Sequence, residues 1–464
     1  MKEKTKKFIG NRNFYKMVML IAMPIMLQQG ITSFVSLLDN IMVGRIGTEE
    51  MSGVAIANQL LFVYNLCIFG CLSGASIFLA QFFGAKDNEG VRACFRFKLI
   101  TATIVFLLAS AIFFFFGKNL INLFLADTGE NVGDIERVLA LGYEYLLVML
   151  FGIFPFAISQ VYGTTLRETK EAIAPMVAGI IAIFVNLIFN YILIFGHFGF
   201  PAMGVKGAAI ATVISRYVEM GILVLYTHLK SNKYVFIKGV YKTFKIPFSL
   251  IERIMIKGTP LILNEVLWSI GMTVIVQCYS IRGLIVIASF NISSTVSNIF
   301  FVSFQALGRA IAIIVGQLLG ANEYEEAKET STKMLFFTSA ICLFLGLVLI
   351  SISFFVPGLY NTTDSVKNLA TSFMIIAGIC LPIFAFNNGC YYTLRAGGVT
   401  TVTFLFDSVF VWVVSIPLAF VLSKYTSINI IYVYFIVQAS EIIKSIIGYT
   451  LVKKEVWVKN IVLT

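Results

Sequence analysis

Long apolar stretches dominate this sequence and leave it few ways to fold. Twelve of them run for about twenty residues or more, and a helix of that length crosses about 30 Å of hydrocarbon. The chain is therefore predicted to be an all-α integral membrane protein. The twelve predicted transmembrane helices span residues 16–43, 52–82, 97–117, 140–164, 173–196, 206–229, 257–280, 286–318, 333–356, 369–393, 401–422 and 429–452.

The composition agrees with a membrane location. The chain has 464 residues, of which 58% are hydrophobic and only 13% are charged. A soluble domain of this size needs far more charge to cover its surface. The basic segment 1–16 leads into a full-length apolar helix without a small-residue cleavage pattern, so we expect a cytoplasmic tail and not a removed signal peptide.

The distribution of positive charge predicts the orientation. The net charge is +11, and the predicted topology assigns 25 of the 35 Lys and Arg residues to cytoplasmic segments and seven to external loops. This bias follows the positive-inside rule and predicts that both termini lie in the cytoplasm, at the inner (cytoplasmic) membrane of the cell. The same bias accounts for the net positive charge, so we expect no nucleic-acid partner.

Several functional classes lose support from the sequence. A Gly-rich phosphate-binding loop is missing, so we expect neither nucleotide hydrolysis nor another enzymatic activity, and no cofactor. The seven cysteines are scattered and mostly lie inside predicted helices, which suggests neither a disulfide framework nor a metal site. A channel or a receptor is disfavoured because neither a filter-like loop nor a soluble sensory domain is recognisable.

The two halves of the chain repeat each other. One constant shift aligns Pro24 with Pro260 and Gln81 with Gln317 without a gap, and "TLR" at 165–167 recurs at 393–395. Six helices therefore occur twice in the same orientation, and substrate sites of such parallel repeats lie between the halves. We predict an N-terminal lobe over 1–235 and a C-terminal lobe over 236–464, which begins with a basic cytoplasmic linker.

Asp39 is the acidic residue near the outer end of the first predicted helix. A carboxylate inside a span costs about 2.5–3.5 kcal/mol on insertion scales, so it invites a functional hypothesis. Asp39 can hold a proton or, when charged, bind Na⁺. The structural alternative is a residue at headgroup level, or one paired with Arg45.

The fifth predicted helix carries two amides on one face. Asn186 and Asn190 are four residues apart, and Thr212 in the sixth helix offers a further oxygen. Amide oxygens can ligate a cation, but amides also bridge neighbouring helices by hydrogen bonds. With Asp39 they predict a mostly neutral cation-coupling pocket that contains one titratable group, and no other metal site is expected.

Charged residues inside the C-terminal spans form a second set. Glu265 and Arg309 lie at depths that agree within about 5 Å, so they can form a buried ion bridge, or they can act in coupling or gating. Asp407 is open to the same two interpretations, with Arg395 as its expected structural partner.

Several motifs, taken in order, resemble those of bacterial multidrug and toxic compound extrusion (MATE) transporters over nearly the whole chain. They are "AMPIMLQQGITSFVSLLDNIMVGRIG", "AQFFGAKD", "NLIFNYILIFG", "GQLLGA" at 316–321 and "TLRAGG" at 393–398. The resemblance implies two six-helix lobes around a V-shaped central cleft. It also implies multidrug efflux by antiport with Na⁺ or H⁺.

The family pattern also assigns candidate residues. Its helix 1 aspartate matches Asp39, and its helix 5 polar pair and helix 6 threonine match Asn186, Asn190 and Thr212. Glu265 matches a helix 7 glutamate of the NorM-type branch, whereas Asn387 stands where that branch has an aspartate. We expect small organic substrates, alternating access and a monomer in the lipid bilayer. A lipid-linked oligosaccharide or polysaccharide flippase of the same superfamily is the alternative.

Overall fold

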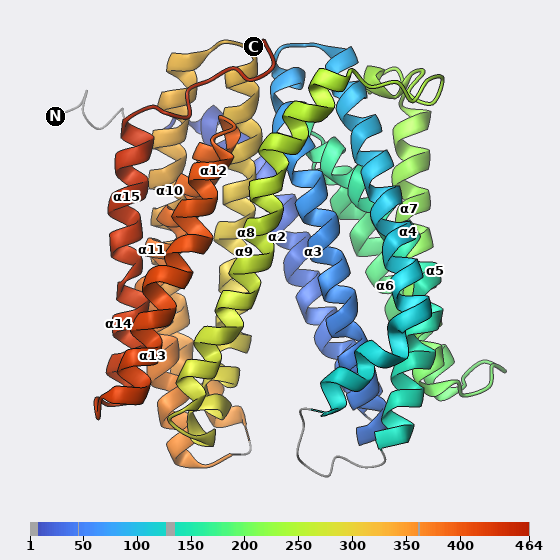
Figure 1. Cartoon of the computed structure of the whole chain (residues 1–464), viewed down its shortest axis with the longest axis vertical. Coiled ribbons are helices and arrows are strands. Elements are labelled where there is room, and N and C mark those ends of the chain that lie inside the picture. The colour runs from blue at the N-terminus through green and yellow to red at the C-terminus, as the bar shows by residue number, and fades with distance from the viewer. Residues whose placement is uncertain (1–7, 45, 127–134, 361, 464) are drawn as a thin grey trace. The chain divides into compact units, whose positions relative to one another are not determined.

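The computed structural model describes residues 8–44, 46–126, 135–360 and 362–463, and their secondary structure is entirely helical (Figure 1). Twelve helical segments are long and apolar enough to cross a membrane, as the sequence predicts. The elements of the first half are α2 (Arg12–Gly44), α3 (Thr48–Gly84), α4 (Asn88–Ala126), α5 (Ile135–Glu168), α6 (Ile173–Phe195), α7 (Gly204–Leu229) and the short η1 (Val235–Ile237). Those of the second half are α8 (Phe248–Ser280), α9 (Leu284–Gly320), α10 (Tyr324–Ser353), η2 (Val356–Leu359), α11 (Asp364–Ala396), α12 (Thr400–Phe404), η3 (Leu405–Val409), η4 (Val411–Ser415), α13 (Ile416–Tyr425), α14 (Ile430–Ala439) and α15 (Glu441–Lys453).

Most helices extend beyond the apolar stretches from which they were predicted. Many of the extra residues are polar, and five helices carry glutamates in their first turn. They are Glu49 and Glu50 in α3, Glu89 in α4, Glu136 in α5, Glu325 and Glu326 in α10, and Glu441 in α15. A negative charge there interacts favourably with the positive end of the helix dipole. The apolar stretch therefore marks the part of the helix that is expected to span lipid, and it is shorter than the whole helix.

The chain forms two compact units. One consists of residues 1–26, 80–87 and 253–464, and the other of residues 27–79 and 88–252. Helices α2 and α3 each contribute to both. A core of the first unit lies along α9, where Leu307 and Ile311 are fully buried, and includes Leu394 and Trp457. The predicted lobe boundary between 235 and 236, and the V-shaped cleft, stay predictions.

The internal repeat is visible in the bounds of the helices. The offset from α2 to α8 is the same at both helix ends, and it equals the offset from α3 to α9. The ends of α3 and α9 cross within the first unit at a pair of equivalent positions. A Cβ on Gly84 would collide with the backbone of Gln317, and a Cβ on Gly320 would collide with the backbone of Gln81. Glycine is required at both because the two backbones touch.

The last two spans are irregular, although the sequence predicts them as continuous helices. The eleventh contains two π-helical segments, η3 and η4, directly before α13. Pro417 follows η4, and proline cannot donate the backbone hydrogen bond that a regular helix requires. The twelfth span breaks at Ser440, between α14 and α15.

The basic linker packs on the second unit. Arg92 and Arg96 of α4 donate to carbonyl oxygens of the linker, among them Phe236 at 3.0 Å and Val240 at 2.8 Å. Glu171 accepts from Lys233 at 2.6 Å. Burial opposes ionisation of Glu171, but hydrogen bonds from Lys233 and Tyr234 lower its pKa overall. The linker is thus held by α4 and by the connection between α5 and α6.

Candidate functional site

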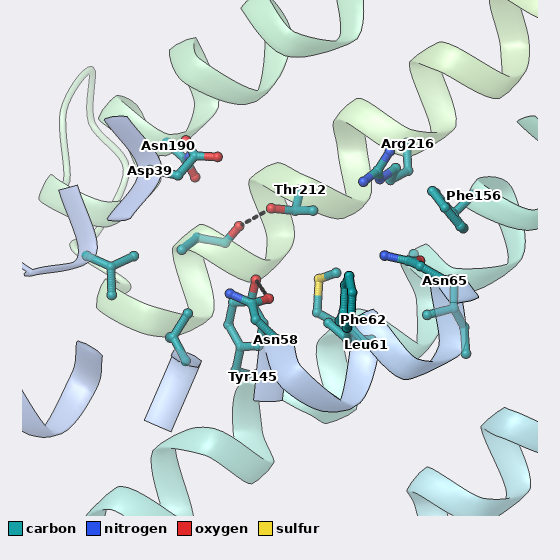
Figure 2. A pocket seen from close by; sticks show the side chains of 16 residues that line it. Asp39, Asn58, Leu61, Phe62, Asn65, Tyr145, Phe156, Asn190, Thr212 and Arg216 are labelled. Atoms are coloured by element: carbon teal, nitrogen blue, oxygen red, sulfur yellow. Dashed lines mark hydrogen bonds between the residues drawn. The ribbon is translucent and has the colours of Figure 1, made fainter. Parts of the chain in front are cut away.

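A cavity of about 320 Å³ opens among α2, α3, α5, α6 and α7, within the second unit. Figure 2 shows Asp39 and Asn190 on one side of it and Arg216 with Phe156 on the other, with Thr212, Tyr145 and Asn58 between them. The lining combines polar and aromatic side chains and consists of Asp39, Val43, Val54, Asn58, Leu61, Phe62, Asn65, Tyr145, Met149, Gly152, Ile153, Phe156, Asn190, Ala208, Thr212 and Arg216.

A continuous hydrogen-bonded network links the four residues that the sequence assigns to cation coupling. Asn190 Nδ2 donates to Asp39 Oδ1 at 2.7 Å and lies 3.2 Å from Asn186 Oδ1. Asn186 Nδ2 donates in turn to Thr212 Oγ1 at 3.2 Å. Asn186 is buried behind Asn190 and supports the network, while the other three line the cavity.

Local sequence explains why these side chains meet. Asn186 and Asn190 lie one turn apart on one face of α6. Asn186 reaches Thr212 on α7, and Asn190 reaches Asp39 on α2. Gly207 lets α7 approach closely, because a Cβ there would lie 2.6 Å from the carbonyl oxygen of Leu193 on α6. Thr212 follows Gly207 on α7 and comes within reach of Asn186.

Arg216 corrects the expectation of a mostly neutral pocket with one titratable group. Its guanidinium lies 4.7 Å from the ring centroid of Phe156, and its Nη1 lies 3.4 Å from a carboxylate oxygen of Glu219. The cavity therefore contains a positive charge as well as Asp39. The sequence could have predicted this positive charge, because a charged residue within a span, such as Arg216, is a functional candidate by default.

Two further polar residues were not singled out from the sequence. Tyr145 on α5 donates its hydroxyl to Asn58 Oδ1 on α3 at 3.3 Å, and both line the cavity. A tyrosine and an asparagine in apolar helices are too common to stand out. Only the packing of α3 against α5 brings them together in the wall of the cavity. Arg45, the alternative partner of Asp39, lies outside the described residues.

The oxygen atoms of Asp39 and its neighbours suit a hard monovalent cation or a proton. Asp39, Asn190 and Thr212 all line the cavity and carry carboxylate, amide and hydroxyl oxygens, which are the ligands that hard cations prefer. A carboxylate within a mostly apolar helix is equally able to exchange a proton. Clusters of three or more His, Cys, Asp or Glu side chains are not found among the described residues, so a transition-metal site gains no support there.

The C-terminal candidates lie in the first unit. Glu265 on α8 is half-buried and within electrostatic reach of Arg395, Asp407 and Arg309. Both arginines lie within electrostatic reach of Glu265, whereas the sequence had pointed to Arg309 alone. The coupling or gating roles of Glu265, Asp407 and Arg309 stay predictions.

Asp407 has a different partner from the one expected. Its Oδ1 lies 2.6 Å from the ammonium of Lys444 on α15, and its Oδ2 accepts from Asn264 Nδ2 at 3.1 Å. The expectation that Arg395 pairs with Asp407 is therefore wrong. Depths counted along ideal helices do not predict this contact, because Asp407 lies in the π-helical segment η3.

Comparisons with known proteins agree on one family. The MatE family model matches residues 24–192 and again residues 260–421, more than half of the chain. The first positions of the two matches are separated by the offset of the internal repeat, so each half matches the model on its own.

Curated relatives match along almost their full length. A probable multidrug resistance protein NorM of Thermotoga maritima is 24% identical over 449 residues, which cover 97% of this chain and 94% of the relative. The probable multidrug resistance protein YoeA of Bacillus subtilis is 25% identical over 90% of this chain and 89% of its own.

Solved structures confirm the fold. A MATE transporter in complex with MaL6 has a TM-score of 0.84 at 20% identity, and covers 97% of both chains. A mutant of the Vibrio cholerae MATE transporter VcmN has a TM-score of 0.85 at 17% identity over 97% of this chain and 99% of its own. The chain belongs to the MatE family, the multidrug and toxic compound extrusion transporters.

Proposed function

We propose that this chain is a secondary active efflux antiporter that exports organic compounds, often cationic, in exchange for Na⁺ or H⁺. The single observation that carries the proposal is the Asp39–Asn190–Asn186–Thr212 network at the wall of a cavity large enough for a small organic molecule. The names of the relatives, which refer to multidrug resistance, support the same substrate class.

The coupling step uses the charge of Asp39. A cation from outside binds the carboxylate and removes its negative charge from the cavity, which weakens the attraction for an organic cation. One charge that moves down 100 mV releases about 2.3 kcal/mol, enough to sustain a substrate gradient above tenfold. Both ligands must bind the two access states with different affinities, or no coupling follows.

The side chains of the cavity suit flat organic molecules. Phe62, Phe156 and Tyr145 offer aromatic faces, which attract cations and stack on planar rings. Arg216 lies over the ring of Phe156 and beside Glu219, so part of its charge is compensated locally. Asp39 then supplies the negative charge that an organic cation meets on the opposite side.

The bias of Lys and Arg toward predicted cytoplasmic segments supports an inner-membrane protein with both termini in the cytoplasm. We propose that it works as a monomer, since five helices of this chain, α2, α3, α5, α6 and α7, are enough to enclose the candidate cavity.

The variant Asp39→Asn tests the proposal. Asparagine keeps an oxygen that accepts from Asn190 but cannot ionise, so we expect efflux of ethidium or a fluoroquinolone to be lost at normal membrane levels. Glu144→Gln is the matched control, because Glu144 is a half-exposed carboxylate paired with Lys206 at 3.5 Å, outside the cavity. Undiminished efflux by Asp39→Asn would remove Asp39 from the mechanism.

The coupling ion follows from replacement experiments in the same cells. Replacing Na⁺ with choline stops efflux if Na⁺ is the coupling ion, and a protonophore stops it if H⁺ is. Should no organic compound be exported while vesicles translocate a lipid-linked oligosaccharide, the flippase alternative replaces the antiporter.

A further inference from the structure

A second buried charge cluster lies in the first unit, whereas the Asp39 cavity belongs to the second unit. Lys444 Nζ lies 2.6 Å from Asp407 Oδ1 and 3.6 Å from Glu441 Oε2, and its side chain is only 7% exposed. The two carboxylates are 18% and 16% exposed. The three groups together carry a net charge of −1 when all are ionised.

Neutral groups surround these charges and hold them in place. Asn264 Nδ2 donates to Asp407 Oδ2 at 3.1 Å, and Asn387 Nδ2 donates to Glu441 Oε2 at 2.8 Å. Ser445 Oγ donates to Asn387 Oδ1 at 2.6 Å. The carboxylates therefore have amide donors from two helices, α8 and α11, in addition to the ammonium on α15.

Two breaks in helical geometry coincide with the cluster. Asp407 lies in the π-helical segment η3, and Glu441 is the first residue of α15, directly after the break at Ser440. Irregular segments of this kind in spans often mark ion sites, because they free backbone and side-chain groups for binding. Here the position that an ion would take between the two carboxylates holds the Lys444 ammonium.

The ammonium is fixed there. Lys444 Nζ lies 5.4 Å from the ring centroid of Phe406, so the aromatic face adds to the attraction of the carboxylates. Glu265 on α8 faces the cluster within electrostatic reach of Asp407 and adds a further negative charge. Arg395 and Arg309 lie within reach of Glu265 and offset that charge.

We propose that Lys444 is a tethered cation that occupies an oxygen-lined site in the C-terminal half and keeps the coupling ion out of it. The inference rests on the proposed antiport function and goes one step further. Cation exchange is then confined to the Asp39 network, while Lys444 compensates one of the two negative charges of Asp407 and Glu441. The Lys444 ammonium outcompetes a dissolved ion for the two carboxylates because it is covalently attached. Its effective concentration at the site therefore far exceeds that of the ion.

Removal of the ammonium exposes the site. Asp407 Oδ1 and Glu441 Oε2 lie 2.6 Å and 3.6 Å from the same ammonium, so without it they form a largely buried pair of like charges. Such a pair favours the uptake of a cation or a proton. A purely structural Lys444 predicts a different result, namely lower stability without any uptake.

Cation binding to the purified full chain separates these outcomes. All variants are made in the Asp39→Asn background, which silences the Asp39 network. The bound cation is measured as ²²Na⁺ at pH 7.5 and as protons taken up between pH 9 and pH 6.5. We expect Lys444→Met to gain about one Na⁺ or one proton per chain relative to Asp39→Asn alone, and a further Asp407→Asn to abolish that gain.

Lys444→Arg is the matched control, because it keeps the positive charge and is expected to gain nothing. If Lys444→Met does not give a monodisperse protein, Lys444→Gln takes its place. The proposal is overturned if the Lys444 variants gain neither Na⁺ nor a proton, or if Lys444→Arg gains as much as Lys444→Met. Efflux plays no part in this readout, so failure of the antiport proposal in the Asp39→Asn efflux assay remains a separate result.

Discussion

The amide of Asn190 helps to position Asp39. Asn190 donates to Asp39 Oδ1 at 2.7 Å and is itself held by Asn186 at 3.2 Å, so α6 fixes the orientation of a carboxylate on α2. A hydrogen bond to a charged group contributes about 1.5–3 kcal/mol, which corresponds to a tenfold change in an equilibrium constant or more. The effect of its removal depends on which ion Asp39 takes up.

Asn190→Ala therefore distinguishes the two coupling ions. With Na⁺, the variant loses an oxygen ligand and the orientation of Asp39, and the half-saturating Na⁺ concentration of efflux should rise about tenfold. With H⁺, the ionised form of Asp39 loses a donor, and the pH of half-maximal efflux should rise by about one unit.

Asn186→Ala serves as the control for that experiment. Asn186 contacts Asn190 and Thr212, so its loss is expected to have a smaller effect than the loss of Asn190. Titration of efflux against Na⁺ and against pH in both variants measures the difference. Equal effects, or none in either variant, would show that the amide of Asn190 does not tune Asp39.

At the scale of elements, the repeat places two glycines where helices α3 and α9 cross. Each glycine lies against the backbone of the glutamine from the opposite helix, Gly84 on Gln317 and Gly320 on Gln81. Residues at equivalent positions of the two halves thus make equivalent contacts, and in each contact the backbones of the two helices touch. Only residues without a Cβ allow it.

Gly320→Ala is expected to destabilise the protein. The added methyl group collides with backbone and not with a mobile side chain, and overpacking of this kind typically costs about 1–3 kcal/mol. Thermal unfolding of the purified protein in detergent should show a lower midpoint. Gly221→Ala on α7 is the control, because nothing lies within 4 Å of a Cβ there, and its midpoint should stay the same or rise. A midpoint for Gly320→Ala at or above that of the unchanged protein contradicts the crossing.

At the scale of the molecule, antiport requires that the two ligands influence each other's binding. Linkage makes this influence reciprocal, and couplings of about 1–3 kcal/mol correspond to roughly 5- to 150-fold changes in affinity. In the proposed mechanism the cation and the organic substrate both depend on the charge of Asp39. Either ligand should therefore weaken the binding of the other.

Ethidium binding to the purified protein tests this linkage. We expect the ethidium dissociation constant to rise at least about fivefold when the coupling ion is supplied, either as Na⁺ or by lowering the pH from 8 to 6. The dependence should disappear in Asp39→Asn and persist in Glu144→Gln. If neither Na⁺ nor pH changes the ethidium dissociation constant of the unchanged protein, coupling through Asp39 is excluded.

Apolar length and periodic repetition were sufficient to predict much of this protein. Lipid provides no alternative partners for the backbone, so a long apolar segment must be helical, and all twelve spans are found. Asp39, Asn186, Asn190 and Thr212 were recognisable because polar groups inside a span are costly and therefore rare. Their spacing on a regular helix also allowed Asn186 and Asn190 to be placed on one face.

Pairing between distant helices was decided by the tertiary structure alone. Lys444 and not Arg395 neutralises Asp407, because π-helical turns in one span and a break in the next change which way their side chains point. Arg216 enters the Asp39 cavity because α7 packs beside α5 and brings the guanidinium over Phe156. The apolar environment of the bilayer requires each span to be helical, so local structure follows from the sequence. Contacts between distant helices depend on how each helix is rotated and where it is irregular, and the spacing of residues along the sequence does not predict either.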